Sequence, residues 1–396
     1  MKRRPSPLPL LRKAKQYMSA QRMKCSLWTV ALLLCLPMLT ACSDDDDDST
    51  TPVLPADMQI TEVVGGLQNP WGMAFLPDGR LLITERSGGL RILENDGSLS
   101  APLHGVPEVY ADFQGGLLDV AIHPDFESEP WVYLSYAEPG SGDLAGTAMG
   151  RGTLGSGGLE NFEVLFRQEP KVSGGAHFGS RICFHEGYLF LSTGDRNVTS
   201  AAQELDSHIG KILRLLPDGS LPTDNPFSDQ PDALPEIWTF GNRNVQGLAV
   251  DPATGLLWAS EHGPAGGDEL NKILPGENYG WPLVSWGDEY GGAPIPNPDT
   301  QPELKDAALW WTPAIAPAGM DFYTSPALPS LQGKLLLGGL QARGIVVIQV
   351  DGNAASEVSR IELDRRVRDV KQGPDGAVYI LTDEGNGSLL RLHKDG

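Results

Sequence analysis

Residues 374–392, PDGAVYILTDEGNGSLLRL, contain the pattern that decides the fold: a tight turn, an apolar strand, a short polar turn and a second apolar strand. Related turn and strand patterns recur five times nearer the N-terminus, which makes six units at uneven spacings of roughly 40 to 80 residues. The apolar segments of the other five units are RLLITERSGGLRIL (80–93), WVYLSYAE (131–138), YLFLSTGD (188–195), LLWASEHG (256–263) and KLLLGGLQARGIVVI (334–348).

A strand unit repeated six times is typical of a β-propeller, whose blades need about 40 residues each, with the excess forming loops. Helical periodicity is scarce, and the chain contains 47 Gly and 32 Pro, as expected for many short strands joined by turns. The pattern therefore predicts an all-β, six-bladed propeller over residues 56–396. A β-sandwich with long loops is the alternative, but it gives no reason for six similar units.

The N-terminus has the composition of an export signal. Residues 1–24 carry eight Lys/Arg and no acid, and an apolar stretch, Leu27–Leu39, follows. The ending Leu39-Thr40-Ala41-Cys42 resembles a bacterial lipobox, in which the Cys is lipidated. We expect residues 1–41 to be a lipoprotein-type signal peptide and 42–55, with five consecutive Asp, to be an acidic linker. The protein would then be periplasmic or on the cell surface; an uncleaved anchor or a plain signal peptide is the alternative.

Charge and cysteine content narrow the possible partners. The chain has 30 Lys/Arg and 51 Asp/Glu; without residues 1–41, 22 bases face 51 acids and the net charge is −29. Such a surface repels phosphate backbones, so we expect no nucleic-acid partner. Cys183 is the one Cys beyond the lipobox, so no disulfide is expected.

Three long segments carry a family resemblance: GNRNVQGLAV (241–250), SEHGPAGGDELN (260–271) and GENYGWP (276–282). With them, nearly all of the chain after the linker resembles the soluble quinoprotein glucose/sorbosone dehydrogenase family. The resemblance implies a six-bladed propeller, the cofactor pyrroloquinoline quinone (PQQ) and Ca²⁺. It also implies oxidation of aldoses at C1 to lactones, with electrons passed to an external acceptor such as a quinone, a cytochrome or a dye.

His177 is the candidate general base. Oxidation of a sugar C1 hydroxyl requires removal of its proton, and imidazole is the side chain suited to this near neutral pH. The resemblance implies that His177 is the base, that Asp195 orients it and that Gln114 lies near quinone and substrate. A lone His is more often a structural residue, and Asp195 alone would be read as a turn-forming residue.

The resemblance also implies a cofactor pocket. PQQ has three carboxylates, and Arg forms paired hydrogen bonds with carboxylates. Alternation along a strand places Arg366 and Arg368 on one face, with Val367 on the other. Trp310 and Trp311 are candidates for a wall stacked on the planar cofactor, and equally for core or rim aromatics. The predicted cofactor-binding residues are Gln114, Arg243, Asn244, Tyr290, Gln341, Arg366 and Arg368.

The predicted metal ligands are oxygen donors, which Ca²⁺ prefers. The resemblance implies that the carbonyls of Gly263 and Pro264 bind the catalytic calcium, and that Glu269 and the carbonyl of Tyr279 hold a second, structural calcium. Two positions depart from related glucose dehydrogenases. Ala176 stands where these have an Asp that contributes to substrate contact, and Gln341 stands near a Lys placed against the cofactor.

Two other functions remain open at this stage. A calcium-dependent propeller lactonase or esterase would need a carboxylate-rich cage at the channel centre, and the separate Arg residues do not favour it. A non-catalytic surface propeller that binds carbohydrate or protein would keep the blades without the site chemistry. No Cys/His cluster has zinc spacing, and no GxGxxG follows a strand and opens a helix.

Overall fold

A computed structural model describes residues 54–55 and 57–394. The predicted signal peptide, Cys42 and the acidic linker up to residue 53 lie outside these residues. In the described part of the chain, no helix has both the length and the apolar character needed to cross a membrane. Its regular elements are strands β1–β24 and two short 3₁₀ helices, η1 (Thr199–Gln203) and η2 (Pro298–Thr300).

The strands form six separate antiparallel sheets, as the repeats predict. The first three sheets are β2 (Pro70–Phe75), β3 (Leu81–Glu85) and β4 (Gly89–Leu93); β5 (Leu117–Ile122), β6 (Trp131–Pro139), β7 (Leu144–Gly155) and β8 (Gly158–Arg167), with β9 (Val172–Ser173) paired to β7; and β10 (Ile182–His185), β11 (Tyr188–Ser192), β12 (Lys211–Leu215) and β13 (Ile237–Phe240).

The remaining sheets complete the propeller. They are β14 (Val245–Val250), β15 (Leu257–Glu261), β16 (Asp268–Lys272) and β17 (Leu309–Trp311); β18 (Pro317–Tyr323), β19 (Lys334–Gly339), β20 (Gly344–Asp351) and β21 (Ala354–Glu362); and β22 (Val367–Gln372), β23 (Val378–Thr382), β24 (Gly387–Lys394) and β1 (Met58–Leu67). Each of the six sequence units falls in a different sheet, so the prediction of six blades is confirmed.

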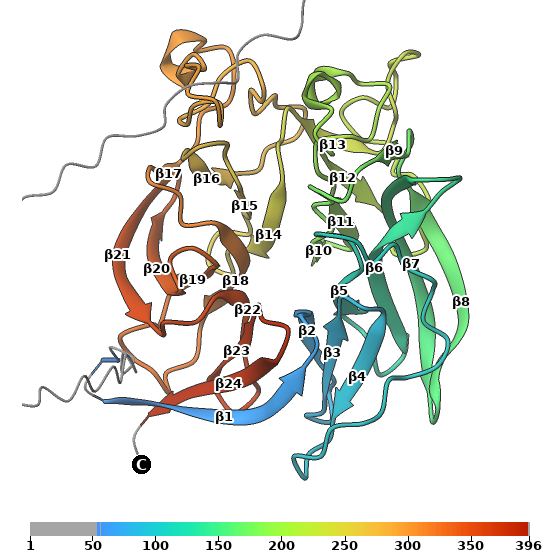
Figure 1. The fold of residues 1–396 in the computed structure, drawn as a ribbon, viewed down its shortest axis with the longest axis vertical. Helices are drawn as coiled ribbons and strands as arrows, with labels where there is room; N and C mark the ends of the chain where they lie inside the picture. The colour runs from blue at the N-terminus through green and yellow to red at the C-terminus, as the bar shows by residue number, and fades with distance from the viewer. Residues whose placement is uncertain (1–53, 56, 395–396) are drawn as a thin grey trace, which may run out of the picture. The chain divides into compact units, whose positions relative to one another are not determined.

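The innermost strands β2, β5, β10, β14, β18 and β22 each contact the next, and β22 contacts β2, which closes the ring (Figure 1). The last sheet is built from both ends of the described chain. Its outermost strand, β1, pairs antiparallel with β24, from Met58 opposite Lys394 to Leu67 opposite Gly387. Because this pairing ties the first strand to the last, the ring has no free gap between blades.

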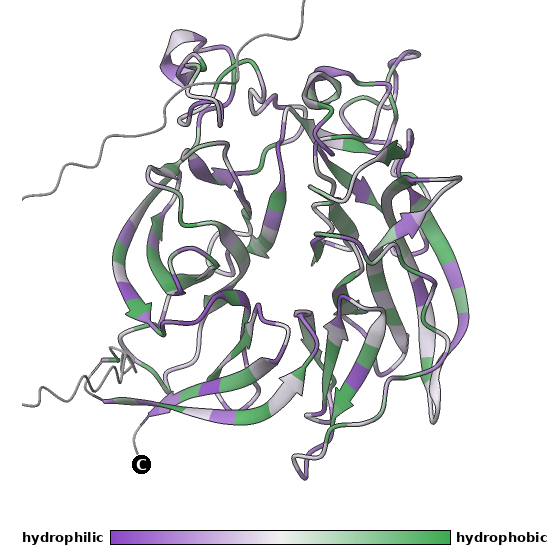
Figure 2. Cartoon of the chain, viewed as in Figure 1, coloured by the Kyte–Doolittle hydropathy of each residue, from purple (hydrophilic) through white to green (hydrophobic). Residues whose placement is uncertain are grey.

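The core explains why the strands read as continuous apolar runs instead of alternating ones. Side chains alternate across a strand, and here both faces of each sheet pack against a neighbouring sheet, so hydrophobic residues (green in Figure 2) are frequent along the strands. In β11, Leu189 and Leu191 pack toward the second sheet, with Tyr133, while Phe190 packs toward the fourth, with Leu257. Six such clusters, one between each pair of adjacent sheets, make up most of the buried apolar surface of the described residues.

Candidate active site

Five of the six inner strands, all except β10, share an irregularity near their first residues. Register shifts, which mark bulges, occur at Pro70/Met73, Leu117/Val120, Val245/Gly247, Pro317/Met320 and Val367/Asp369. A bulge re-aims a side chain that strict alternation would send to the other face. In β22, Arg368 lies within the irregular stretch and lines the main cavity, while the next residue, Asp369, reaches the side chain of Arg181.

The main cavity, of about 390 Å³, receives residues from distant parts of the chain. Four predicted residues line it: Gln114, Asn244, Arg366 and Arg368. The other lining residues are Trp71, Arg86, Phe113, Leu118, Phe178, Gly179, Gln246, His262, Ala316, Leu340 and Asp383. The propeller therefore brings together residues more than 250 positions apart, between Gln114 and Arg368.

His177 lies beside this cavity in a buried chain of hydrogen bonds. Its Nδ1 is 2.6 Å from Asp195 Oδ1, and Trp281 Nε1 donates to Asp195 Oδ2 at 2.8 Å. The backbone N–H of His177 donates to Gln114 Oε1 at 2.8 Å. The structure thus places all three predicted catalytic residues in one hydrogen-bonded group, to which it adds Trp281.

The ionisation of Asp195 sets the tautomer of His177. Burial opposes ionisation, but hydrogen bonds from His177 and from the backbone of Asn197 outweigh it and lower the pKa of Asp195. An ionised carboxylate only accepts hydrogen bonds, so Nδ1 carries the proton of the neutral imidazole. The lone pair of Nε2 is then free to accept a proton.

The backbone has an unusual conformation at His177 and at the two residues that follow Asp195. His177 (φ 55°), Arg196 (φ 51°) and Asn197 (φ 60°) occupy the left-handed region that non-glycine residues seldom adopt. Gly194 is required because a Cβ there would lie 2.0 Å from the carbonyl oxygen of His177. Such strain persists only where the surroundings impose it, and it is frequent at functional sites.

Arg196 is a residue of this region that the sequence did not indicate. Its buried guanidinium donates to the carbonyls of Gly174 and Ala176 and lies 3.7 Å from the ring centroid of Phe178. Burial lowers the pKa of Arg196 to about 10. The side chain therefore fixes the segment that leads into His177, and its position directly after Asp195 is the only sequence signal that could have found it.

Positive charge dominates the lining of the main cavity. Arg86, Arg366 and Arg368 line it, and Asp383 is the one carboxylate among the lining residues. Burial opposes ionisation of Asp383, but Arg368 and Arg366, whose Nη2 atoms lie 3.1 and 2.9 Å from its oxygens, lower its pKa to about 2. The net charge of these four groups is +2, which suits an anionic ligand.

Four arginines of this region, Arg86, Arg181, Arg196 and Arg243, have a buried nitrogen without a partner among the described residues, and two of them, Arg86 and Arg243, line a cavity. The Nε atoms of Arg86 and Arg243 are buried and have no partner among the described residues. Arg243 donates from Nη1 to the carbonyl of His262 at 3.0 Å, and Arg86 donates from Nη1 to the carbonyl of Phe113. Buried donors are rarely left unpaired in native proteins, so these two indicate a missing acceptor.

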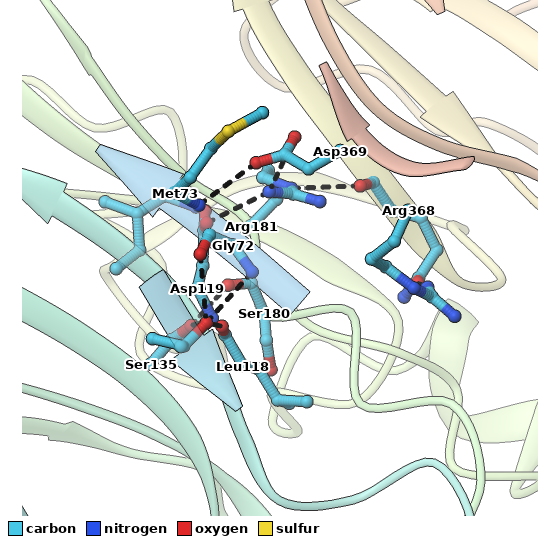
Figure 3. Close-up of polar contacts among 12 residues, drawn as sticks. Gly72, Met73, Leu118, Asp119, Ser135, Ser180, Arg181, Arg368 and Asp369 are labelled. Atoms are coloured by element: carbon cyan, nitrogen blue, oxygen red, sulfur yellow. Dashed lines mark hydrogen bonds and ion pairs between the residues drawn. The ribbon is translucent and has the colours of Figure 1, made fainter. Parts of the chain in front are cut away.

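A buried ion cluster consists of Arg181, Asp119 and Asp369, and its two aspartates directly follow Leu118 and Arg368, two residues that line the main cavity (Figure 3). Arg181 Nη1 lies 3.0 Å from Asp119 Oδ1 and 3.3 Å from Asp369 Oδ1. The guanidinium of Arg181 also lies 4.2 Å from the ring centroid of Trp71, which lines the cavity. Arg181 thus joins Asp119, Asp369 and the cavity residue Trp71 in one buried group.

A second, small cavity of about 10 Å³ adjoins the first, because His262 lines both. All four predicted metal ligands line it, namely Gly263, Pro264, Glu269 and Tyr279, together with Arg243 and Glu261. Space of this size holds about one water-sized particle. Among the described residues, no three His, Cys, Asp or Glu side chains cluster as metal ligands, so an ion here would depend on carbonyl oxygens.

Two buried acids of the second cavity, Glu261 and Glu269, repel each other when both are ionised. Burial and the charge of Glu261 hold the pKa of Glu269 well above its ordinary value, and burial also raises the pKa of Glu261. Asn271 Nδ2 donates to both carboxylates at 3.0 Å, yet its Oδ1 is buried without a partner. A bound cation would offset the repulsion, and the carboxylate and carbonyl oxygens that line this cavity are donors that Ca²⁺ prefers.

The structure does not bring every predicted residue to the main cavity. Tyr290 is 76% exposed, with its ring centroid 5.9 Å from the Arg243 guanidinium. Gln341 lines a separate hollow together with Trp310 and Trp311. Trp311 is buried and donates to Glu357, and Trp310 stacks on Trp286 with ring centroids 4.7 Å apart, so neither indole is part of the main cavity wall.

Comparison with known proteins settles the family. The sequence profile described as "Glucose / Sorbosone dehydrogenase" matches residues 67–391. The chain belongs to the glucose/sorbosone dehydrogenase family. An aldose sugar dehydrogenase of Escherichia coli (strain K12) is 44% identical over 348 residues, which make up 85% of this chain and 93% of that protein.

Solved structures agree with this assignment. The soluble aldose sugar dehydrogenase of Escherichia coli, in its apo-form, has a TM-score of 0.82 at 43% identity and covers 85% of this chain and 100% of that one. The PQQ-bound form of the aldose sugar dehydrogenase of Streptomyces coelicolor has a TM-score of 0.68 at 29% identity, over 87% of this chain and 100% of that one. Membership of this family makes the chain an oxidoreductase.

Proposed function

We propose that the protein is a PQQ- and calcium-dependent aldose dehydrogenase that oxidises the C1 hydroxyl of sugars to the lactone. The observation that carries the proposal is the buried chain Trp281–Asp195–His177 beside a cavity lined by arginines, in a member of the glucose/sorbosone dehydrogenase family. A relative with the same fold is solved with PQQ bound.

His177 would act as the general base. With the proton of the neutral ring on Nδ1, its Nε2 takes the proton from the C1 hydroxyl, and the resulting imidazolium lies 2.6 Å from the Asp195 carboxylate. Trp281 and Asn197 hold that carboxylate in place through hydrogen bonds of 2.8 and 2.9 Å. The ring is therefore oriented before substrate arrives, which removes a reorganisation cost from the reaction.

The cationic residues would hold the cofactor. Arg366, Arg368 and Arg86 present guanidinium groups to the main cavity, and the unpaired Nε of Arg86 and Arg243 match the need of a tricarboxylate for donors. PQQ held by these residues would supply a hydride acceptor for C1, and an external acceptor would be needed to reoxidise it. Of the two calcium ions that the resemblance implies, the second cavity has space for about one, with the carbonyls of Gly263 and Pro264, Glu269 and the carbonyl of Tyr279 as the candidate ligands.

The cavity favours this function over a calcium-dependent lactonase. Such a lactonase needs several carboxylates around one ion at the channel centre, whereas Asp383 is the one carboxylate lining the main cavity and is paired with Arg366 and Arg368. A non-catalytic binding propeller would have no use for the His177–Asp195 pair, whose buried geometry serves proton transfer.

Reconstitution tests the proposal directly. The PQQ-free protein should gain dye-linked oxidation of aldoses only when PQQ and Ca²⁺ are both added, and a panel of aldoses without activity would refute it. His177→Ala should abolish turnover while PQQ still binds, as followed by visible absorbance on titration. Loss of cofactor binding in that variant would mean that His177 supports the pocket instead of the chemistry.

We also propose that Cys42 carries a lipid that anchors the enzyme to the outside of a bacterial membrane. The support is the lipobox-like sequence before Cys42 and the acidic linker after it. Cys42→Ser should move the protein from the membrane fraction to the periplasmic fraction. An unchanged membrane fraction would contradict the anchor and leave the enzymatic proposal untouched.

A further inference from the structure

Phe113 is an aromatic residue placed against the usual rules for its type. It lines the main cavity, yet it is 70% exposed, and its φ is 50°. A large apolar side chain gains by burial and a bulky residue rarely adopts positive φ, so both preferences are violated at one position. Neither the exposed ring nor the positive φ stabilises the fold, so a functional role would explain why a Phe stands here.

The loop that carries Phe113 is held firmly. Arg86 donates to the carbonyl of Phe113, and Gly115 N–H donates to the carbonyl of Asp112 at 2.8 Å. On the other side, the loop is joined to the segment of the candidate base. The N–H of Gln114 donates to the carbonyl of Gly175 at 2.8 Å, and the N–H of His177 donates back to Gln114 Oε1 at 2.8 Å.

Two features show that the surroundings accommodate Phe113 at a cost. A Cβ at Gly175 would lie 2.9 Å from the Cβ of Phe113, so the facing segment has a glycine where the two loops approach. The strained φ would be relieved by a glycine at 113 itself, since only glycine adopts this conformation freely. The loop therefore fixes the backbone from which the exposed Phe113 lines the cavity, and Gln114 joins it to Gly175 and to His177 by one hydrogen bond each.

We propose that Phe113 is a specificity-determining residue that selects pyranose sugars by stacking on the C–H face of the ring. The inference rests on the proposed function and deepens it. A pyranose presents axial C–H groups on its faces, and these pack on an aromatic ring while the hydroxyls at the edge stay hydrogen-bonded. Covering the exposed ring of Phe113 would remove apolar surface from water and hold the sugar where C1 faces His177.

The expected size of the effect follows from the contact. Replacing Phe113 by Ala removes one apolar face, for which we expect a loss of about 0.7–1.4 kcal/mol, equivalent to roughly 3- to 10-fold. Phe113→Ala should therefore raise the KM for glucose and xylose by roughly 3- to 10-fold, since 1.4 kcal/mol corresponds to tenfold. Phe113→Tyr should keep the wild-type KM within about twofold, because its ring has the same face. The affinity for PQQ should be unchanged in both variants.

Thermal unfolding gives a readout that does not depend on turnover. Phe113→Gly should unfold at the wild-type melting temperature or above it, because glycine relieves the positive φ, while its KM rises as in Phe113→Ala. A high concentration of methyl β-D-glucopyranoside, which cannot react at C1, should raise the melting temperature of the PQQ-free wild type more than that of Phe113→Ala. Leu221→Ala is the matched control, since Leu221 is 47% exposed and lines neither cavity.

The outcomes separate this inference from the function on which it rests. A KM of Phe113→Ala within twofold of wild type would overturn it, as would a clear drop in the melting temperature of Phe113→Gly, which would assign Phe113 a structural role. An equal KM increase in Leu221→Ala would also overturn it. A wild type without any aldose oxidation would instead overturn the proposed function, and this inference with it, before any variant is compared.

Discussion

Replacing Asp195 by Asn tests the part of the site on which proton transfer depends. Asp195 Oδ1 lies 2.6 Å from His177 Nδ1, and the carboxylate is 1% exposed. Protonation of His177 in the reaction would create a charge pair, and unit charges about 4 Å apart attract by about 4 kcal/mol at an effective dielectric constant near 20. That energy corresponds to a factor of roughly 10³ in rate.

An Asn keeps the shape and one hydrogen-bond acceptor but loses the charge. We therefore expect kcat to fall by about 10²- to 10³-fold, with the smaller value if the amide oxygen still accepts the Nδ1 proton. The assay is dye-linked aldose oxidation with saturating PQQ and Ca²⁺, followed between pH 5 and pH 9. Circular dichroism and the melting temperature show whether the variant is folded.

The pH dependence of stability gives a second readout with a defined sign. Burial opposes ionisation of Asp195, but hydrogen bonds from His177 and Asn197 outweigh it and lower its pKa. The ionised carboxylate therefore adds stability above the unfolded pKa of about 3.9, and this is lost as the pH falls through the lower folded pKa. The Asn variant should lack this contribution to acid unfolding.

A folded Asp195→Asn protein with more than a fifth of the wild-type kcat would refute the role assigned to the pair. Glu186→Gln is the matched control. Its carboxylate lies 3.9 Å from His185 Nε2, so it is also an acid beside a histidine, but its side chain is 76% exposed. Because exposed pairs contribute little, this change should leave both kcat and stability as they are.

Three other changes test the remaining parts of the site. Glu269→Gln should raise the free energy of unfolding of the calcium-free protein by about 1–2 kcal/mol in denaturant at pH 7. Burial and Glu261 raise the pKa of Glu269, so its charged form destabilises the fold above the unfolded pKa. The increase in stability on adding Ca²⁺ should be smaller than in the wild type, and an equal increase would argue against a metal there. Arg366→Ala should weaken PQQ binding by roughly 10- to 100-fold in an absorbance titration, because a charge-assisted hydrogen bond is lost. An unchanged affinity would show that Arg366 does not bind the cofactor. Gly319→Ala should lower the free energy of unfolding by about 2 kcal/mol or more, because the new Cβ would lie 1.8 Å from Asp369 Oδ1 in the ion cluster. Gly157→Ala, with open space around the new Cβ, should lower it by less than about 0.5 kcal/mol. Similar losses in both variants, measured by denaturant unfolding, would contradict the packing argument.

Local pattern predicted most of the fold. The apolar runs at 188–191 and 334–337 form strands β11 and β19, and the repeated turns mark the six blades. These features are readable because a strand packed on both faces needs apolar residues throughout, whatever its neighbours are. The family motifs likewise led to Gln114, Asn244, Arg366 and Arg368, which the propeller brings to one cavity.

Other residues of the site were not predicted from the sequence. Arg181 and Arg196 are single arginines outside the quoted segments, Arg86 lies in the repeat segment 80–93 but has no functional motif around it, and Phe113 looks like an ordinary loop residue. Their roles depend on position: Arg181 lies between two aspartates, and Arg196 holds the carbonyls before His177. Gln341 was predicted to bind the cofactor because of the residues around it in the sequence. In the structure it lines a separate hollow instead of the main cavity.

The sequence by itself determined that this protein is a ring of six sheets, because strand periodicity and turn residues act over a few positions. Only the tertiary structure decided which side chains share the cavity. Closure by β1 on β24 sets the ring, and bulges in the inner strands turn individual side chains toward the channel or away from it. A shift of one residue sends a strand's side chains to the opposite face, so contacts between distant blades cannot be read from spacing along the chain.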